Sequence, residues 1–394
     1  MFLVTTAVED FWDKSEEILF LGEWCKLYDR KDELNNLSYN TLSFEWNNPE
    51  KIENAYDLCN EVYEIMLVKL THKLNEVHNL DKSVYFYRII LGNWLIRFIH
   101  QYYDKYINIT NAMNNYSDLT TYILDEKQYY VPSDIEDYID KQVFSDIYNL
   151  QLYSDIVKFV GMKHLVKSLF IHLEIKTRME VNNSKKDKIS SFLTKVMRVV
   201  SGINIFNKNK LVLVNPYFKY NKFYNIMVLF VKSNFRYIFD DFKYTIDIKN
   251  SVDYDIRKKL NFRSETNNPF ENLLCKTIFN HIPSLFLENF SEFRKSVESL
   301  KINTDKVYYT AQALHGNNVF KFFIAERFNA IKILTHQHGG AYGIDKRLYQ
   351  EEYEKSLSSI YFTWGWGGEE CEVLPFPKHK SNQKDEKNFI LFTM

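Results

Sequence analysis

The sequence predicts an α/β fold in which a Rossmann-like parallel sheet carries a helical insertion. Three observations lead to this prediction. Continuous apolar runs stand at 2–5 and 18–21, and such runs are typical of parallel strands covered on both faces. Segments with helical spacing of apolar residues dominate about 50–160. From about 271 onward, predicted strands and helices alternate, as they do in doubly wound sheets.

The helical segment contains three apolar stripes. The first runs from Ile52 to Val77 and leaves acids and lysines on the opposite face. The second, over about 82–106, is apolar nearly all round, so we expect it at the centre of the fold. It includes Arg97, and a charge in the middle of a bilayer costs about 2.5 kcal/mol or more, which favours a buried helix over a membrane span. The third stripe covers 148–160.

In the second half of the chain, some segments predict secondary structure clearly and others do not. Residues 176–270 are rich in Asn, Lys, Tyr and Phe, and they yield only a predicted helix at 187–200 and a strand at 211–214. Beyond them the pattern is clear. It predicts helices at 284–300, 317–329 and 346–357, and strands at 307–310, 331–335 and 360–363.

The end of the sequence suggests a further domain. Residues 376–388 are polar and read as a linker, and 389–394 have the composition of a buried strand. A lone apolar strand needs more polypeptide to cover it. We therefore expect 1–375 to be an N-terminal domain, and 389–394 to be the first strand of a missing C-terminal nucleotide-binding domain that is poorly anchored without it.

Composition excludes several function classes. Lys and Arg total 50 and Asp and Glu 51, giving a net charge of -1, so no overall field attracts nucleic acid. The four cysteines form no CxxC pair, which fits a reducing compartment and argues against a zinc knuckle. The N-terminus lacks the features of a signal peptide. We expect a cytoplasmic protein whose membrane association, if any, is peripheral at the inner membrane.

Glycine marks two loops. The chain has 11 glycines, and seven of them fall between 316 and 368. Gly339, Gly340 and Gly343 stand between a predicted strand and a helix, where backbone N–H groups are able to cradle a phosphate. We assign Gln337 and Tyr342 of the same loop to substrate binding. The alternative is a tight turn without a ligand.

Two histidines end the strand before this loop. His336 and His338 are two apart and could share a face as a metal pair. No third ligand stands at a familiar spacing, so we expect no metal here. His338 is the candidate for a general base or a phosphate contact, and His336 is expected to be structural.

Further polar and aromatic residues follow predicted strands. Glu351 and Glu354 are three apart on a helix, and either could serve as a base, although a solvated acidic face is the alternative. His315 precedes helix 317–329 and Asn317 begins it, and both are expected at the same cleft. Three more substrate-binding candidates stand at strand ends: Glu23 after 18–21, and Trp364 and Trp366, whose indoles stack on sugars but also fill cores. We expect the loops 339–343 and 364–368 to face each other.

A resemblance to a known family rests on six strings of the sequence: FLVTTAVEDFW, FLGEWCKLYDR, YRIILGNWL, ALHGNNVFKFFIAE, QHGGAYG and TWGWGG. The chain resembles a family of bacterial transferases from lipopolysaccharide, O-antigen and capsule loci, with the motifs QHGG-x-YG and TWGW. That family is distantly similar to glycosyltransferases of GT-B architecture that transfer Kdo or other nonulosonic acids. The resemblance implies the N-terminal part of a GT-B-like enzyme that transfers a sugar from a nucleotide-sugar donor to a glycan acceptor.

This reading needs no metal and no cofactor, because such sites use helix dipoles and basic side chains. The N–H groups of Gly339 and Gly340 would stabilise developing negative charge. One alternative is a non-catalytic, acceptor-binding scaffold subunit that pairs with a separately encoded C-terminal donor domain. Another is a metal-dependent hydrolase built on His336 and His338.

Overall fold

The computed structural model describes most of the chain outside the middle segment and the C-terminal end. The described residues are 1–169, 211–216, 237–240, 242, 244, 246, 252–260, 262, 266–300, 306–368 and 371–374. The predicted helix at 187–200, the linker at 376–388 and the strand at 389–394 lie outside them.

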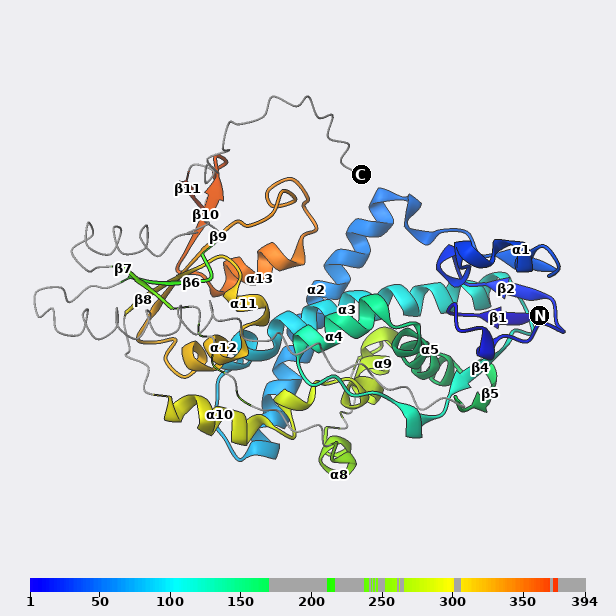
Figure 1. Cartoon of the computed structure of the whole chain (residues 1–394), viewed down its shortest axis with the longest axis horizontal. Coiled ribbons are helices and arrows are strands. Elements are labelled where there is room, and N and C mark those ends of the chain that lie inside the picture. Colours follow the sequence, from blue (N-terminus) through cyan, green and yellow to red (C-terminus); the bar gives the residue numbers. More distant parts are fainter. Residues whose placement is uncertain are drawn as a thin grey trace, which may run out of the picture.

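The first sheet is built by the N-terminal residues. Its five strands run in the order β3-β2-β1-β4-β5, and every neighbouring pair is parallel. Figure 1 shows this sheet at the N-terminal end of the molecule. The strands are β1 (Phe2–Val4), β2 (Ile18–Phe20), β3 (Tyr39–Thr41), β4 (Thr120–Leu124) and β5 (Lys163–Lys167).

The second sheet lies at the opposite end of the molecule (Figure 1). Its six strands run in the order β11-β10-β9-β8-β6-β7, again all parallel. Because β7 lies on one side of β6 and β8 on the other, the strand order reverses between β6 and β8. The strands are β6 (Leu211–Val214), β7 (Tyr237–Phe239), β8 (Val307–Thr310), β9 (Lys332–His336), β10 (Ile360–Trp364) and β11 (Cys371–Leu374).

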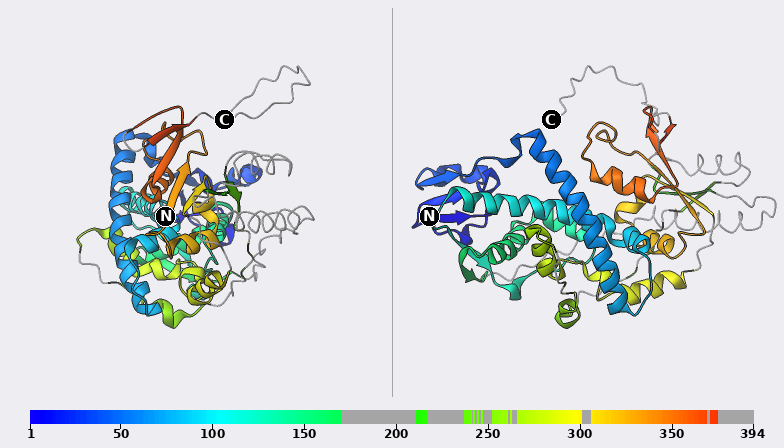
Figure 2. Two further views of the ribbon diagram at one scale, coloured as in Figure 1. Left: turned by 90° about the vertical axis from the view of Figure 1, so that its left-hand side faces the viewer. Right: turned by 180° about the vertical axis from the view of Figure 1, so that it is seen from behind.

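Two long helices connect the ends. In the right-hand view of Figure 2, α2 (Pro49–His78) and α3 (Val84–Asn115) cross the middle of the molecule. Asn48 caps α2 by accepting a hydrogen bond from the Glu50 N–H, and Ser83 caps α3 in the same way through the Phe86 N–H. No helix in the described ranges is long and apolar enough to cross a membrane.

The shorter helices surround α3, which packs against α2, α5, α12 and α13. Trp94 of α3 is fully buried and stacks on Phe98 with ring centroids 5.3 Å apart. The shorter helices are α1 (Lys31–Leu34), α4 (Ile135–Phe144), α5 (Asp146–Val160), α8 (Tyr254–Lys258), α9 (Pro269–Thr277), α10 (Phe290–Ser299), α11 (Ala313–Gly316), α12 (Asn318–Ala325) and α13 (Tyr349–Leu357).

The predicted α/β class is confirmed, but the strands form two sheets where the sequence suggested one. The apolar runs located β1, β2, β6, β8, β9 and β10. The pattern missed β3 and β5, whose side chains are mostly exposed and polar, and it also missed β7 and β11. The segment 50–160, expected to be a helical insertion, also contains β4 of the first sheet. The helix expected over 284–300 is divided into a short 3₁₀ turn, Ser284–Phe286, and α10.

A buried lysine leads to a stability prediction. Lys321 of α12 is 0% exposed, and its Nζ makes no hydrogen bond to a described residue. Burial lowers its pKa to about 8, against the opposing charges of Asp134 and Glu136. We expect Lys321→Met to stabilise the fold at pH 7 by roughly 1–3 kcal/mol, because the charged amine no longer has to be buried.

The pH dependence follows from the same shift. Below the folded pKa both states hold the proton, and the penalty is constant. Between that pKa and the ordinary lysine value the unfolded state binds more protons, so the native protein gains stability as pH rises. Thermal unfolding between pH 7 and 10 should show this rise in the native protein and its loss in Lys321→Met. The exposed Lys332→Met serves as control, and an equal response in both variants would contradict the assignment.

Candidate functional site

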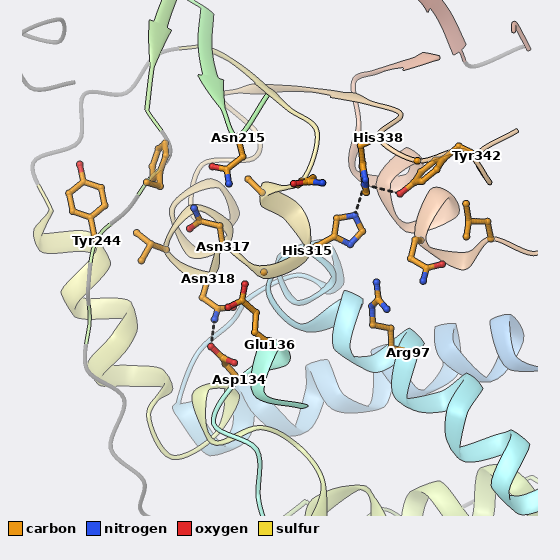
Figure 3. A pocket seen from close by; sticks show the side chains of 18 of the residues that line it. Arg97, Asp134, Glu136, Asn215, Tyr244, His315, Asn317, Asn318, His338 and Tyr342 are labelled. Carbon is orange, nitrogen blue, oxygen red and sulfur yellow. Dashed lines mark hydrogen bonds between the residues drawn. The ribbon is translucent and has the colours of Figure 1, made fainter. Parts of the chain in front are cut away.

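A cavity of about 910 Å³ opens at the carboxyl edge of the second sheet (Figure 3). Asn215 follows β6, Gln312 follows β8, and 338–341 follow β9, and all of them line it. The Ala311 N–H donates to the Asn215 carbonyl at 3.4 Å, which joins the loops after β6 and β8. This is the point where the strand order reverses, and ligands of open α/β sheets bind at such points.

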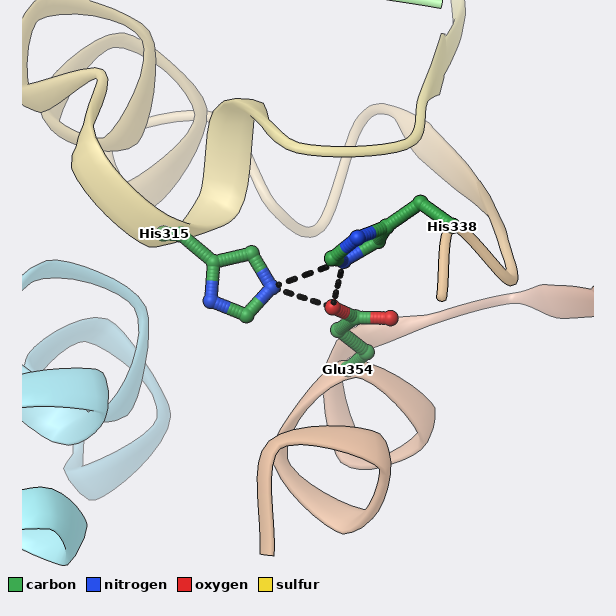
Figure 4. Close-up of side chains that lie close together, drawn as sticks. All are labelled: His315, His338 and Glu354. Carbon is green, nitrogen blue, oxygen red and sulfur yellow. Dashed lines mark hydrogen bonds and ion pairs between the residues drawn. The ribbon is translucent and has the colours of Figure 1, made fainter. Parts of the chain in front are cut away.

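Four polar side chains converge at one end of the cavity (Figures 3 and 4). His338 Nε2 lies 2.9 Å from Glu354 Oε1 and 3.3 Å from His315 Nε2. His315 Nε2 is also hydrogen-bonded to Glu354 Oε1. The Tyr342 hydroxyl lies 2.8 Å from His338 Nε2 and 3.0 Å from Glu354 Oε1. We call these residues, His315, His338, Tyr342 and Glu354, the histidine cluster. They come from α11, the loop after β9, and α13.

Hydrogen bonds set the protonation of the histidine cluster. Asn93 Oδ1 accepts from Arg97 Nε at 3.1 Å, so Asn93 Nδ2 faces His315, 2.9 Å from its carbonyl oxygen and 3.4 Å from Nδ1. His315 Nδ1 is then an acceptor, and Nε2 carries the proton that is donated to Glu354. His338 Nδ1 makes no hydrogen bond to any described residue.

Glu354 is the centre of negative charge. The residue is 1% exposed. Burial acts to raise the pKa of its carboxyl, but hydrogen bonds from His315 and His338 outweigh that effect and hold the pKa below its ordinary value. Burial lowers the pKa of His315 in spite of the Glu354 contact, so its imidazole remains neutral near pH 7. Glu354 is therefore an ionised, buried acceptor.

The loop between β9 and α13 is held by contacts behind the cavity. Gln337 Oε1 accepts from the Trp364 N–H at 2.9 Å and from Trp366 Nε1 at 2.8 Å. The Gly343 N–H donates to Glu351 Oε2 at 2.9 Å. The loops after β9 and β10 therefore pack directly against each other, although they were expected to face each other across a cleft, and β9 is parallel to β10 as expected. Gln337, Gly343 and Glu351 support the loop and do not form the cavity wall.

Gly343 gives a prediction about this loop. Its φ is 71°, and a Cβ there would lie 2.4 Å from the Trp366 ring. We expect Gly343→Ala to destabilise the protein by roughly 1–3 kcal/mol, since it adds left-handed strain and displaces an indole. Gly340→Ala is the matched control, because nothing lies within 4 Å of a Cβ at Gly340. Thermal unfolding that shows equal losses in both variants would contradict this reading.

Arg97 supplies positive charge to the cavity. It is the one Lys or Arg among the cavity residues that the structure describes. Its guanidinium is fixed by the Nε bond to Asn93 and lies 5.8 Å from the Tyr349 ring centroid. No carboxylate in the described part of the chain forms an ion pair with it. Arg97 was not predicted from the sequence as a site residue, although an arginine in a helix that is apolar nearly all round is a usable signal.

The other end of the cavity carries carboxylates and amides. Asp134 and Glu136 stand at the start of α4, and Asn317 and Asn318 at the start of α12. Asn318 Nδ2 donates to Asp134 Oδ2 at 3.1 Å. Such groups are suited to hydrogen-bonding sugar hydroxyls. Of this group, only Asn317 was predicted from the sequence as a site residue.

The structure thus brings together His315, Asn317, His338, Gly339, Gly340 and Tyr342 at the cavity, with Glu354 behind them. Glu23 is not brought there: it begins a 3₁₀ turn, Glu23–Cys25, after β2 of the other sheet. Trp364 and Trp366 also do not line the cavity, because their indoles bond to His336 and Gln337. His336 accepts from Trp364 Nε1 at 2.9 Å and lies outside the histidine cluster, as expected for a structural histidine.

Comparison with known proteins gives one family. A family model described as LIC12162 family transferase matches residues 1–393. No curated protein matches the chain, and no solved structure does.

Proposed function

Because the chain belongs to the LIC12162 family of transferases, we propose that it transfers a sugar from a nucleotide-activated donor to a bacterial surface glycan. The observation that carries this proposal is the histidine cluster at the wall of a cavity beside the strand reversal of the second sheet. Such a cavity provides, within one volume, a base, a cation and hydroxyl-binding groups. These are the groups that glycosyl transfer needs.

In the proposed reaction an acceptor hydroxyl attacks the anomeric carbon of the donor sugar. A new C–O bond forms as the bond from that carbon to the donor phosphate breaks, and the electron pair leaves with the phosphate. The hydroxyl proton goes to His338. Its Nε2 is engaged by Glu354, so Nδ1 is the nitrogen that accepts the proton, and the carboxylate stabilises the resulting imidazolium.

The leaving phosphate needs positive partners. Arg97 is the cation of the cavity wall, and Gly339 and Gly340 offer backbone N–H groups close to His338. We assign the phosphate to these three residues. Asp134, Asn317 and Asn318 would bind sugar hydroxyls at the other end.

The two acidic candidates of α13 differ in their surroundings. Glu351 accepts the Gly343 N–H and pairs with Lys355 at 2.8 Å, away from the cavity. Glu354 contacts both histidines. We therefore propose that Glu354 acts through His338 and that Glu351 supports the loop. Four unpaired cysteines support a cytoplasmic place for the reaction.

Ligand binding tests the proposal. The protein is screened by thermal shift against CMP-, UDP-, GDP- and dTDP-linked sugars, and each binder is then tested for transfer to a surface-glycan acceptor. A binder at 100 times its dissociation constant stabilises the fold by about 2.7 kcal/mol. Stabilisation by one nucleotide class, with release of that nucleotide, is the expected result. Stabilisation by acceptor saccharides alone would overturn catalysis and favour an acceptor-binding scaffold.

A further inference from the structure

The histidine cluster also has the composition of a metal site. We propose that His315, His338 and Glu354 bind one divalent transition-metal ion, such as Zn²⁺, with the Tyr342 hydroxyl as a neighbouring fourth group. The two imidazole nitrogens and one carboxylate oxygen lie within 4.8 Å of one another. Two histidines and a glutamate are a ligand set that zinc enzymes use, with the fourth position left for water or substrate.

The spacing of the two imidazole nitrogens agrees with tetrahedral coordination. With Zn–N bonds of about 2.0–2.1 Å, two ligand atoms of a tetrahedron lie about 3.3 Å apart. The two Nε2 atoms of His315 and His338 are 3.3 Å apart. His338 Nε2 and Glu354 Oε1 are 2.9 Å apart, a few tenths of an ångström short of that edge. His315 Nε2 and Glu354 Oε1 are in direct hydrogen-bond contact and lie closer together still, so the carboxylate has to move outward to admit the ion.

The carboxylate has unused capacity. Glu354 Oε2 is buried and makes no hydrogen bond to a described residue. A buried acceptor without a partner is costly, and a cation next to the carboxylate would relieve that cost. This oxygen is directed away from the two histidines (Figure 4), so it would contact the ion only after the carboxylate turns.

Sequence spacing could not reveal this site. The adjacent pair His336 and His338 does not form it, because His336 is bonded to Trp364. The second histidine is His315, 23 residues before His338 and on another element. The third ligand, Glu354, follows 16 residues later on α13.

Metal binding requires the Nε2 proton of each histidine to move, because both imidazoles donate from Nε2 to Glu354 in the hydrogen-bonded form. The His338 proton moves to its Nδ1. In the hydrogen-bonded form His315 carries its proton on Nε2, because Asn93 Nδ2 faces Nδ1. A metal on Nε2 places the proton on Nδ1, and the Asn93 amide then has to turn its oxygen toward it. An aspartate at this position would offer that acceptor permanently, as in the carboxylate–histidine–zinc arrangement.

The consequence for catalysis rests on the proposed function. A metal ion on His338 Nε2 removes the carboxylate contact that makes His338 a base. The metal-bound protein would therefore be inactive in transfer, and free Zn²⁺ would inhibit it. The four polar atoms of the histidine cluster either hydrogen-bond to one another or bind the metal ion, but they do not do both at once.

Cobalt spectroscopy tests the site without relying on activity. The chelator-treated protein is titrated with Co²⁺, whose visible absorption reports tetrahedral coordination. We expect one bound Co²⁺ that Zn²⁺ displaces. His315→Ala and Glu354→Gln should weaken binding by more than the roughly 100-fold that loss of an outer partner costs, and Asn93→Asp should tighten it. The exposed His72→Ala is the control and should bind like the native protein.

The outcomes separate the two proposals. A native protein that binds no Co²⁺, or that loses it equally in His72→Ala and His315→Ala, overturns the metal site and leaves the transfer proposal intact. Circular dichroism of each variant excludes unfolding as the cause. If the metal-free protein transfers sugar and Zn²⁺ stops it, both proposals hold. If transfer requires the metal, the site stands and the role of His338 as a base is wrong.

Discussion

His338→Ala is expected to abolish sugar transfer while leaving the fold intact. The imidazole lines the cavity and makes its bonds to Glu354, His315 and Tyr342. A positioned general base contributes roughly 10²–10⁴-fold to a rate, so kcat should fall by that factor. The side chain is partly exposed and contributes little to the apolar core, so the thermal midpoint should change little. The measurement is initial rate in the intact protein after treatment with a chelator.

Glu354→Gln distinguishes the role of His338 as the base from the role of Glu354, which holds His338 in place. It preserves the shape of the side chain and removes the charge that holds His338. We expect a smaller loss of kcat than in His338→Ala, together with a shift of the pH–rate profile, because the carboxylate stabilises the imidazolium. A His338→Ala protein that keeps its rate within a few fold would remove His338 from the mechanism. An unfolded one would show that the residue is structural.

Arg97→Ala is expected to weaken binding of the nucleotide-sugar donor. The guanidinium faces the cavity without a carboxylate partner among the described residues, and a hydrogen bond to a charged group contributes about 1.5–3 kcal/mol, or roughly 10–150-fold in affinity. The loss should appear in the donor dissociation constant, measured by calorimetry with the donor and with its free nucleotide. If the free nucleotide loses affinity equally, Arg97 contacts the phosphate. A loss confined to the intact sugar would instead place Arg97 at a sugar carboxylate.

Arg97→Lys is the matched variant for this test. It keeps the charge but cannot reproduce both the bond to Asn93 and a bidentate contact to an anion. An intermediate affinity is therefore expected. Unchanged donor binding in Arg97→Ala would exclude the residue from recognition and leave the anion to the Gly339 and Gly340 N–H groups.

The sequence located β6, β8, β9 and β10 of the second sheet, because they are apolar runs bounded by polar residues, but it did not locate β7 or β11. It failed where strands are exposed. β5, for example, has no fully buried side chain, so it lacks the signal on which such predictions depend. The assignment of strands to two sheets was also beyond reach, since an apolar run indicates burial but not which strand it pairs with.

The candidate site was predictable where it is local. His338, Gly339, Gly340 and Tyr342 lie on one loop, and glycine in a chain with only 11 of them is an informative signal. Glu354 was within reach through helical spacing from Glu351. Arg97 and Asp134 were not, because they approach the cavity from helices more than 170 residues earlier in the chain. Only tertiary packing brings them there.

Helix α3 begins against the second half of the protein and continues to the first sheet. Near its start, the Tyr85 hydroxyl donates to the Leu357 carbonyl, and the Tyr353 hydroxyl donates to the Ile89 carbonyl. Residues 1–160 and 306–368 are therefore not interchangeable modules. A chimera that exchanges only the N-terminal portion between two members of the family would place the residues at positions 93 and 97 of one member in the cavity of the other. Recombination that preserves specificity has to exchange α3 together with α11 and α13. A breakpoint after β3 keeps these three helices in one exchanged segment, whereas a breakpoint at residue 160 separates α3 from the other two.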